Sequence, residues 1–398
     1  MMAKHIVILG AGYAGMIAAL RIAKKAKGVD ITLINASDHF VERIRLHQVA
    51  ANQKLKAHYI PNVLRGTSIK FVQGYVTSLN PDSRTLSMGD GQPITYDYLI
   101  YAVGSKNDRH KLPGVAQYAY MLSPDGERSA RDLGDRLKTL SDGGRVIIIG
   151  GGLTGVEAAS EIATKYPDLR VSLFVTSQFG KYLSQKGQAY LRQTFAQMNI
   201  TVHESARIKQ VAAQAVIMEN NEQIDCDLCV WAGGFTTHPL AREANIHTNK
   251  LGQVLIDPFL RSISHPNIYA VGDCANFEEA PGAPIEMGCK TAEPMAAQAS
   301  DNLAARLNGK PEQPMGFAYV FHCISLGRRN GLIQWANLDG TPKERIVTGR
   351  MAVFIKEMIC RLVWVSIPAQ KYFPQLLSWR GQKNGSTTAA LSKAHLQA

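Results

Sequence analysis

The stretch Ile6-Val7-Ile8-Leu9-Gly10-Ala11-Gly12-Tyr13-Ala14-Gly15 decides the fold. Its four apolar residues predict a buried strand, and the three glycines after them have the spacing GxGxxG. Residues 16–25 are rich in Ala, Ile and Leu and predict a helix, and residues 31–34 predict a second strand. A strand, a glycine turn, a helix and a strand in this order indicate the start of a doubly wound parallel sheet.

The same unit occurs again further along the chain. Residues 145–149 are strand-like, Gly150-Gly151-Gly152-Leu153-Thr154-Gly155 repeats the glycine spacing, and residues 156–165 and 171–175 predict a helix and a strand. Glycines at the start of a helix leave its first backbone N–H groups accessible, and a pyrophosphate can bind to these groups. Two such units predict a domain duplication and two bound dinucleotides, for which FAD with NADH or NADPH is the economical pair.

Neither unit carries the acidic residue that would bind a ribose hydroxyl. Asn35 stands at this position in the first unit, and Val175 stands there in the second. An acid at this position favours NADH, because it repels the 2′-phosphate of NADPH. No arginine is adjacent, although Lys181 is near. The choice between NADH and NADPH therefore stays open.

The composition is that of a globular chain of two or three domains. The 398 residues are 45% hydrophobic and 19% charged. The formal net charge of +12 favours an anionic partner, but no helix-turn-helix or aromatic-basic motif indicates nucleic acid. No secretory signal and no apolar stretch of about 18–20 residues is evident, so the expected location is cytoplasmic.

Four segments in order resemble the flavoproteins with two dinucleotide-binding domains in the pyridine nucleotide-disulphide oxidoreductase superfamily. They are residues 10–15, 96–105, 150–157 and 267–275. Within the superfamily the chain is most similar to type II NADH dehydrogenases and their quinone-reducing relatives. That likeness is carried by residues 38–50, 228–234, 317–319 and 326–328. It implies an α/β fold of two nested Rossmann-like dinucleotide-binding domains plus a C-terminal domain that ends in an amphipathic helical segment.

The resemblance also implies domain boundaries. Residues 1–115 and 252–316 would form the FAD-binding domain, residues 116–251 the NAD(P)H-binding domain, and residues 317–398 a segment for membrane or dimer contact. The implied function is hydride transfer from NAD(P)H to FAD and electron transfer on to a quinone, without proton pumping. Two alternatives stay open: a soluble reductase for an acidic ferredoxin-like protein, and a flavin-binding signalling protein without activity.

Two residues are candidates for catalysis. Glu157 matches an acid that the family places near the nicotinamide, and Lys290 would add positive charge where the helix start at 289–292 faces the flavin. An exposed first-turn glutamate and a solvated lysine are the alternatives. The cofactor-binding candidates are Gly10, Gly12, Ala14, Gly15, Asn35, Arg43, Arg45, Val76, Ala102, Val103, Gly104, Gly150, Gly152, Leu153, Thr154, Gly155, Gly233, Gly272, Asp273, Thr291 and Ala292.

Several chemistries are excluded or left open by the sequence. No cysteine precedes Cys226, which excludes the flavin-side cysteines of the superfamily's disulphide reductases. Cys226 and Cys229 would face opposite sides of a strand, so we expect two packed thiols. No His/Cys cluster has metal-ligand spacing, and no metal is predicted. The family's quinone-site helix reads Ala-Gln-x-Ala-x-Gln, but here Glu293 replaces the first Gln and Pro294 follows it, which leaves the acceptor open.

The C-terminal part of the chain predicts an amphipathic helix. Apolar residues recur at helical spacing from Met351 to Val365, with Lys356, Glu357, Cys360 and Arg361 on the other side. Residues 339–398 hold nine Lys or Arg and three Asp or Glu. A basic segment with an apolar side, from 351 to 380, suits peripheral contact with the cytoplasmic face of a membrane. Packing on the protein or in a homodimer is the alternative.

Overall fold

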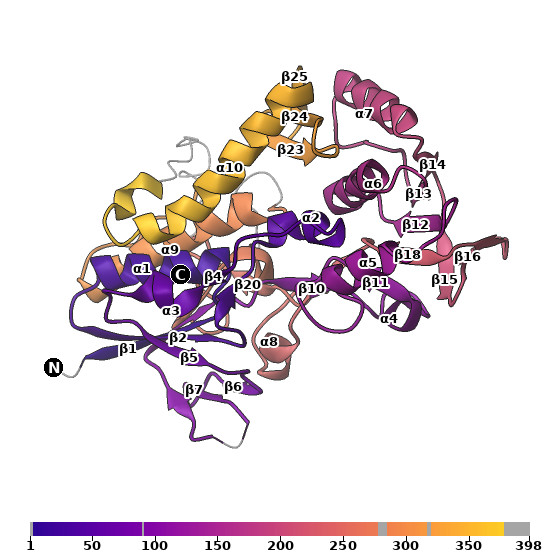
Figure 1. Cartoon of the computed structure of the whole chain (residues 1–398). Helices are drawn as coiled ribbons and strands as arrows, with labels where there is room; N and C mark the ends of the chain where they lie inside the picture. The colour runs from indigo at the N-terminus through magenta and orange to yellow at the C-terminus, as the bar shows by residue number, and fades with distance from the viewer. Residues whose placement is uncertain (1–2, 90, 278–284, 317–319, 378–398) are drawn as a thin grey trace, which may run out of the picture.

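The computed structural model describes residues 3–89, 91–277, 285–316 and 320–377. Two five-stranded parallel sheets organise it (Figure 1). The first has the strand order β21-β9-β1-β2-β5 and the second the order β11-β18-β12-β13-β14. The strands of the first sheet are β1 (Lys4–Leu9), β2 (Val29–Asn35), β5 (Lys70–Gln73), β9 (Tyr98–Tyr101) and β21 (Ile268–Ala270). Those of the second are β11 (Ala119–Met121), β12 (Arg145–Ile149), β13 (Arg170–Phe174), β14 (Thr201–His203) and β18 (Leu228–Trp231).

Both sheets start from the predicted strand–helix–strand unit, so the α/β fold and its duplication are confirmed. Helix α1 (Tyr13–Lys25) joins β1 to β2, and α6 (Leu153–Lys165) joins β12 to β13. Each helix begins three residues before the start predicted from its apolar pattern. The reason is local, because the second half of each glycine motif already forms the first helical turn after the capping residue Gly12 or Gly152.

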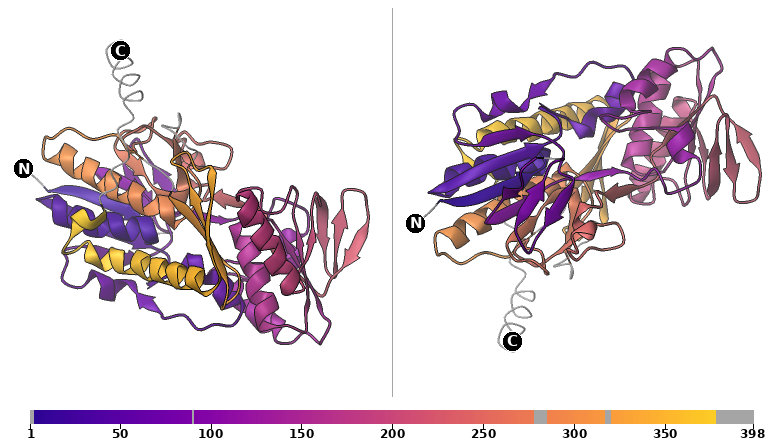
Figure 2. Two further views of the ribbon diagram at one scale, coloured as in Figure 1. Left: turned by 90° about the horizontal axis from the view of Figure 1, so that it is seen from above. Right: turned by 90° about the horizontal axis from the view of Figure 1, so that it is seen from below.

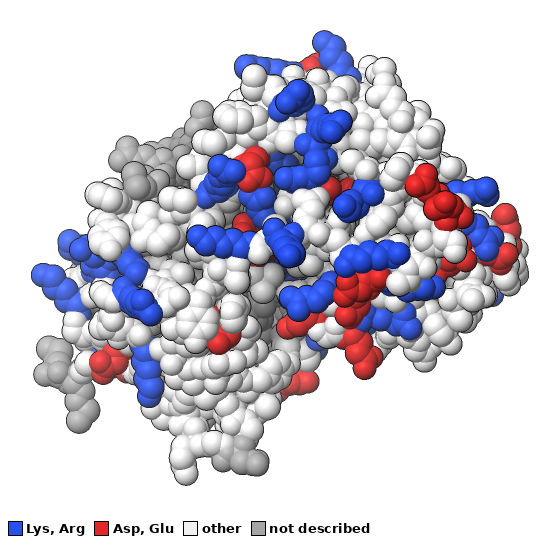
Figure 3. Space-filling view, in the orientation of Figure 1, with Lys and Arg blue, Asp and Glu red and all other residues white. Residues whose placement is uncertain are grey.

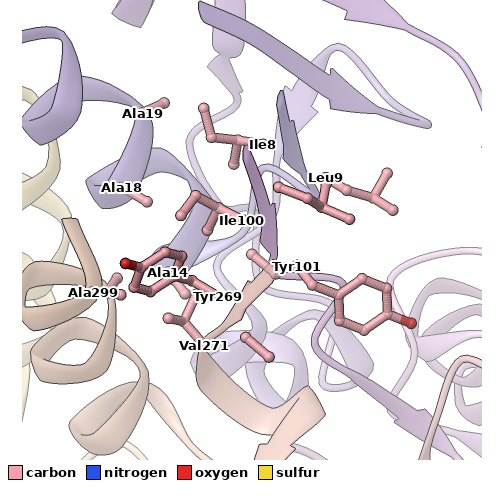
Figure 4. Close-up of a cluster of buried hydrophobic side chains, with 14 of the residues drawn as sticks. Ile8, Leu9, Ala14, Ala18, Ala19, Ile100, Tyr101, Tyr269, Val271 and Ala299 are labelled. Carbon is pink, nitrogen blue, oxygen red and sulfur yellow. The ribbon is translucent and has the colours of Figure 1, made fainter. Parts of the chain in front are cut away.

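Helices α1 and α9 (Cys289–Leu307) pack side by side on the first sheet. Their contact is made by small side chains, which let two helices approach closely on one sheet face. Figure 4 shows Ala14 and Ala18 of α1 beside Ala299 of α9, over Ile100 and Tyr269 of the sheet. The α9 helix therefore returns late in the chain to cover the strands at its beginning.

A three-stranded antiparallel sheet and a long helix follow the strands of the two parallel sheets in the chain. Strands β23 (Phe321–Ser325), β24 (Gly331–Ala336) and β25 (Pro342–Thr348) lie between the two halves, and α10 (Gly349–Ala369) runs from there along the first half (Figure 2). The predicted C-terminal helix is thus confirmed and is longer than its apolar pattern. Residues 317–319, which contributed to the family resemblance, lie outside the described residues. The last part of the proposed membrane or dimer segment, residues 378–398, also lies outside them.

The remaining helices and strands complete the two halves. The helices are α2 (Leu46–Ala50), α3 (Ile60–Leu64), α4 (Val115–Tyr118), α5 (Ala130–Leu137), α7 (Gln185–Gln197) and α8 (Leu240–Glu243). The strands are β3 (His39–Phe40), β4 (His58–Tyr59), β6 (Ser78–Asn80), β7 (Thr85–Ser87), β8 (Ile94–Thr95), β10 (Ser105–Asn107), β15 (Ile208–Ala212), β16 (Ala215–Met218), β17 (Gln223–Asp225), β19 (Phe235–Thr237), β20 (Val254–Ile256) and β22 (Ala275–Phe277). Antiparallel pairing of β10 with β19 joins the segments that connect the two halves.

A buried arginine ties α1, α9 and the end of α10 together. Arg21 is 1% exposed, and its guanidinium donates to both carboxylate oxygens of Asp301, at 2.7 and 2.8 Å, and to Gln370 at 2.9 Å. Burial opposes the ionisation of Asp301, but the hydrogen bonds from Arg21 and Lys25 outweigh it and lower the pKa of this carboxyl. The folded state therefore favours the ionised pair.

We predict that Asp301→Asn lowers the free energy of unfolding by about 3 kcal/mol at neutral pH, because it leaves a buried guanidinium without its counter-charge. The folded-state pKa of Asp301 is lowered, so its contribution is present above the ordinary pKa and is lost as the pH falls through the folded-state pKa. Urea denaturation at several pH values measures both. A variant as stable as the wild type at neutral pH would contradict this role.

Candidate active site

The first glycine turn leaves the start of α1 open to a ligand. Gly10 has φ +102°, and a Cβ atom on Gly15 would lie 1.7 Å from the carbonyl oxygen of Gly10. Glycine is therefore required at both positions for the chain to turn and pack. Gly12 caps α1, and a Cβ atom there would meet nothing within 4 Å. The space beside the first N–H groups of α1 is thus free for an anionic group.

The second turn has the same construction. Gly150 has φ +127°, a Cβ atom on Gly155 would lie 1.9 Å from the carbonyl oxygen of Gly150, and a Cβ atom on Gly152 would meet nothing within 4 Å. Gly10 packs against Ala102, directly after β9, and Gly150 packs against Ala232, directly after β18. In each case a Cβ atom on the glycine would lie 2.4 Å from the carbonyl oxygen of the alanine. The backbone at both turns therefore fits the pyrophosphate of a dinucleotide.

The residues at the ribose positions differ between the turns. The amide oxygen of Asn35 accepts a hydrogen bond from the backbone N–H of Ala11 at 2.9 Å, and its amide nitrogen donates to Ser37 at 2.7 Å. Asn35 thereby holds the first turn. Val175 is buried and lies against Gly151, where a Cβ atom would come within 2.5 Å of it. Neither side chain brings a negative charge to the ribose position.

One cavity of about 370 Å³ touches both halves of the protein. It brings together more than half of the residues proposed from the sequence. Its wall includes the candidates Gly12, Ala14, Arg43, Ala102, Gly104, Leu153, Thr154, Glu157, Gly272, Asp273, Lys290 and Ala292. Buried polar atoms in this wall, the Tyr13 hydroxyl and Nε2 of His47, have no hydrogen-bond partner among the described residues. These two atoms can form hydrogen bonds with polar groups of a ligand bound in the cavity.

The other candidates lie outside the wall and support it. Val76 is buried in the core of the first half, and a Cβ atom on Gly233 would lie 2.6 Å from the Trp231 ring. Thr291 donates to the carbonyl oxygens of Glu286 and Gly288, both at 2.8 Å, and so shapes the start of α9. The full set outside the wall is Gly10, Gly15, Asn35, Arg45, Val76, Val103, Gly150, Gly152, Gly155, Gly233 and Thr291.

Asp273 is fixed at the cavity by two hydrogen bonds. One carboxylate oxygen accepts from the Ser105 hydroxyl at 2.7 Å, and the other accepts from the backbone N–H of Gly288 at 2.7 Å. Ser105 also lines the cavity, and the sequence reasoning missed it. These bonds orient a carboxylate that can accept hydrogen bonds from the hydroxyl groups of a ribose or ribitol chain.

The amino end of α9 opens on the cavity. Cys289, Lys290 and Ala292 belong to its wall, so the positive end of the helix dipole faces the space inside. The Lys290 ammonium contacts the carboxylate of Glu286 and lies 3.2 Å from Nδ1 of His322. Lys290 therefore takes part in a polar group at the cavity, with 30% of its side chain exposed. Such an arrangement can stabilise negative charge on a group bound in the cavity.

Glu157 is the centre of a buried ion-pair cluster at the cavity. Its carboxylate accepts from the Lys356 ammonium and, at 2.9 Å, from the backbone N–H of Ser325, and it lies 3.5 Å from Nδ1 of His47. Burial opposes the ionisation of Glu157, but Lys356 and these neighbours outweigh it and lower its pKa. Burial lowers the pKa of His47 to about 4, so this imidazole is neutral.

Lys356 and His47 were not among the sequence candidates. Lys356 lies in α10, about 200 residues from Glu157, and only its place inside an apolar helix distinguishes it in the sequence. Burial opposes its charge, but Glu157 raises its pKa above the ordinary value. The cavity thus holds a fixed positive and a fixed negative charge side by side.

The two arginines proposed from the sequence have different surroundings. Arg43 lines the cavity, and burial lowers its pKa. Arg45 is paired with Glu42 at 2.9 Å and makes two hydrogen bonds of 2.9 Å to the carboxylate of Glu357 on α10. Arg43 is therefore available to an anionic ligand, whereas Arg45 fastens α10 to the first half.

Three thiols also line the cavity: Cys289, Cys323 and Cys360. Burial raises the pKa of Cys289 and of Cys323 to about 12, and it also raises the pKa of Cys360. The thiolate is the nucleophilic form of cysteine, so all three are unreactive at neutral pH. Cys226 and Cys229 are buried in the core of the second half, as expected for packed thiols.

Helix α10 presents its two sides to different surroundings. Lys356, Ile359, Cys360 and Val363 face the cavity. Large apolar side chains on the other side are exposed, among them Phe354 at 64% and Leu362 at 58%. Within the described part of the chain, no helix has the length and the apolar character that crossing a membrane requires.

Comparison with known proteins shows which family the chain belongs to. The sequence profile of the family described as pyridine nucleotide-disulphide oxidoreductase matches residues 4–300. The NADH dehydrogenase-like protein YutJ of Bacillus subtilis is 26% identical over 371 residues, which cover 91% of this chain and 98% of YutJ. The type II NADH:quinone oxidoreductase of Staphylococcus aureus is 23% identical over 394 residues, with 89% of this chain and 94% of that protein covered.

Solved structures share the fold over nearly the whole chain. The sulfide:quinone oxidoreductase of Aquifex aeolicus superposes with a TM-score of 0.81 at 18% identity and covers 94% of both chains. NDH2 from Plasmodium falciparum, solved in complex with NADH, gives a TM-score of 0.77 at 17% identity and covers 94% of this chain and all of its own. The chain therefore shares the fold of these structures over 94% of its length.

We predict that Lys356→Met lowers the free energy of unfolding by about 3–5 kcal/mol, because a buried carboxylate loses its cation. The double variant Lys356→Met with Glu157→Gln should regain most of this loss, since no buried charge is left unpaired. Urea denaturation of both variants measures the difference. Equal stability of the single and double variants would show that the two charges do not depend on each other.

Proposed function

The chain belongs to the pyridine nucleotide-disulphide oxidoreductase family, and from this premise we propose that it is an FAD-dependent NAD(P)H:quinone oxidoreductase that pumps no protons. The observation that carries the proposal is the single cavity reached from both glycine turns. A cofactor bound at one turn and a nucleotide bound at the other would meet there. When bound, the flavin accepts a hydride from NAD(P)H and passes electrons to an acceptor.

The residues divide between the two nucleotides. In this proposal Gly12, Arg43 and Asp273 hold FAD, and residues 1–115 and 252–316 form its domain. Gly152, Leu153 and Thr154 hold NADH or NADPH on the domain of residues 116–251. The start of α9 with Lys290 stabilises negative charge on the flavin. The ion pair of Glu157 and Lys356 forms a polar part of the cavity wall between the two halves.

A quinone is the acceptor that the proposal favours. The relatives include proteins named as type II NADH:quinone oxidoreductase and, in Synechocystis, demethylphylloquinone reductase. In this chain, Ile359 and Val363 of α10 give the cavity an apolar side. The cavity thiols stay protonated, so they do not compete for the electrophilic ring of a quinone.

The two glycine turns offer a matched pair of variants. Gly12 and Gly152 have φ −75° and −74°, which any residue adopts, and a Cβ atom at either position meets no neighbour within 4 Å. Both alanine variants should therefore fold. We expect Gly12→Ala to lose the yellow flavin spectrum, and Gly152→Ala to keep it but to need at least tenfold more NADH for half-maximal rate.

Titration of flavin absorbance and of NADH oxidation checks this assignment. The same assay run with menadione, a ubiquinone analogue and an acidic ferredoxin-like protein identifies the acceptor. Turnover with quinones supports the proposal. Turnover with the protein alone would favour a soluble reductase, and a chain that binds no flavin would overturn both.

We further propose that α10 rests on the cytoplasmic face of a membrane through the segment 351–380. Residues 378–380 of this segment lie outside the described residues. Its exposed apolar side chains would enter the lipid interface, which is where quinones are dissolved. Lysine and arginine side chains gather over the region of α10 and β25, seen in Figure 3, and they suit anionic headgroups.

Phe354→Glu with Leu362→Glu should lower binding to vesicles of anionic phospholipid by at least tenfold, because two charges would enter the apolar interface. Leu251→Glu is the control, since Leu251 is an exposed apolar residue outside α10. Vesicle flotation measures binding. If the double variant instead splits a homodimer and leaves flotation unchanged, the apolar side is a dimer contact.

A further inference from the structure

Glu293 is a buried carboxyl of helix α9. It lies in the second turn of α9 and is 8% exposed. Its one hydrogen bond among the described residues is accepted from the hydroxyl of Ser366 on α10, at 3.4 Å. The same hydroxyl donates to the carbonyl oxygen of Val363 at 2.9 Å. The single hydrogen of this hydroxyl is shared between the two acceptors, and the bond to Glu293 lowers the pKa of the carboxyl by less than burial raises it.

Among the residues that the structure describes, no cation changes the pKa of Glu293. Tyr13 of α1 and Cys289 of α9 are close enough for electrostatic interaction with it, and α10 contributes Ser366. Burial raises the pKa values of Tyr13 and Cys289, so both are neutral near pH 7. A buried carboxylate among neutral groups is costly. Burial accordingly raises the pKa of Glu293 to about 8.

Glu293 stands directly behind the wall of the cavity. Tyr13, Cys289 and Val363, which surround Glu293 and its serine partner, all line the cavity. The Tyr13 hydroxyl has no hydrogen-bond partner among the described residues. Tyr13 therefore interacts electrostatically with Glu293 and also belongs to the wall of the cavity.

We propose that Glu293 stores the proton that the acceptor takes up and delivers it to the cavity through the Tyr13 hydroxyl. The inference rests on the proposed function. NADH supplies two electrons and one proton as hydride, so the reaction NADH + H⁺ + quinone → NAD⁺ + quinol needs one further proton. Glu293 gives up this proton and is left as a carboxylate, which takes another from solvent after each turnover. Gln, the residue expected here from the family's pattern, could not do this.

The test uses Glu293→Gln, which keeps the size and polarity of the side chain and removes the proton. In the wild type, kcat with a quinone should fall as the pH rises through about 8. In Glu293→Gln, kcat should be lower by at least tenfold and should not change in that range, because a general acid contributes about 10²-fold or more. Glu293→Asp should restore part of the rate together with the pH dependence.

Thermal unfolding provides a readout that does not depend on activity. The folded state holds a proton that the unfolded chain releases between the ordinary pKa of glutamate and about 8, so the Tm of the wild type should fall as the pH rises through this range. The fall should be smaller in Glu293→Gln. Tyr13→Phe should lower kcat as Glu293→Gln does, but should leave the pH dependence of Tm unchanged.

Glu161→Gln is the matched control. Glu161 is also a buried glutamate whose pKa burial raises, but it lies outside the cavity wall and accepts from Gln53 at 2.9 Å. Its kcat profile should follow the wild type. A wild-type chain that reduces no quinone would overturn the proposed function. Quinone turnover with the wild-type pH profile in Glu293→Gln would overturn proton delivery alone.

Discussion

The structure depends on a backbone contact that occurs twice: the first turn of a helix lies against the carbonyl oxygen of the first glycine of its motif. No side chain fits between Gly15 and Gly10, or between Gly155 and Gly150. The close contact fixes the direction of each helix relative to its sheet. It also leaves the N–H groups at the start of the helix beside an open space. The position of the whole cavity relative to the two sheets follows from these two contacts.

Helix α10 connects the rest of the site to that frame. Lys356 reaches the ion-pair cluster on α6, Glu357 binds Arg45 of the first half, and Ser366 meets Glu293 on α9. Trp364 stacks on His58 with ring centroids 3.6 Å apart. One helix therefore joins four separate segments of the chain around the cavity, through Lys356, Glu357, Trp364 and Ser366. Displacement of α10 would disturb all of these contacts together.

The fold was predictable from the sequence because its decisive signals are local. Each glycine motif specifies its own strand, turn and helix within about 30 residues, and both were found with an error of three residues at the helix start. Asp273, Glu157 and Lys290, proposed from motif resemblance, do meet in one cavity. Ser105, His47 and Lys356 were missed because their partners lie 100 or more residues away in the chain, and no local pattern marks such a pairing. The inward side of α10 was also hidden, since its polar residues have the spacing of an ordinary solvated face.

The strand order has a consequence for synthesis of the chain. The second sheet takes all its strands from residues 119–231, whereas the first is completed by β21, at residues 268–270, and covered by α9. On the ribosome, the later half can finish its sheet while the earlier half still has an unpaired edge along β9. The nascent N-terminal strands thus wait for more than 160 residues, with an edge that invites pairing with other chains. Chaperone demand should accordingly fall on the beginning of this polypeptide and end when the residues around β21 emerge.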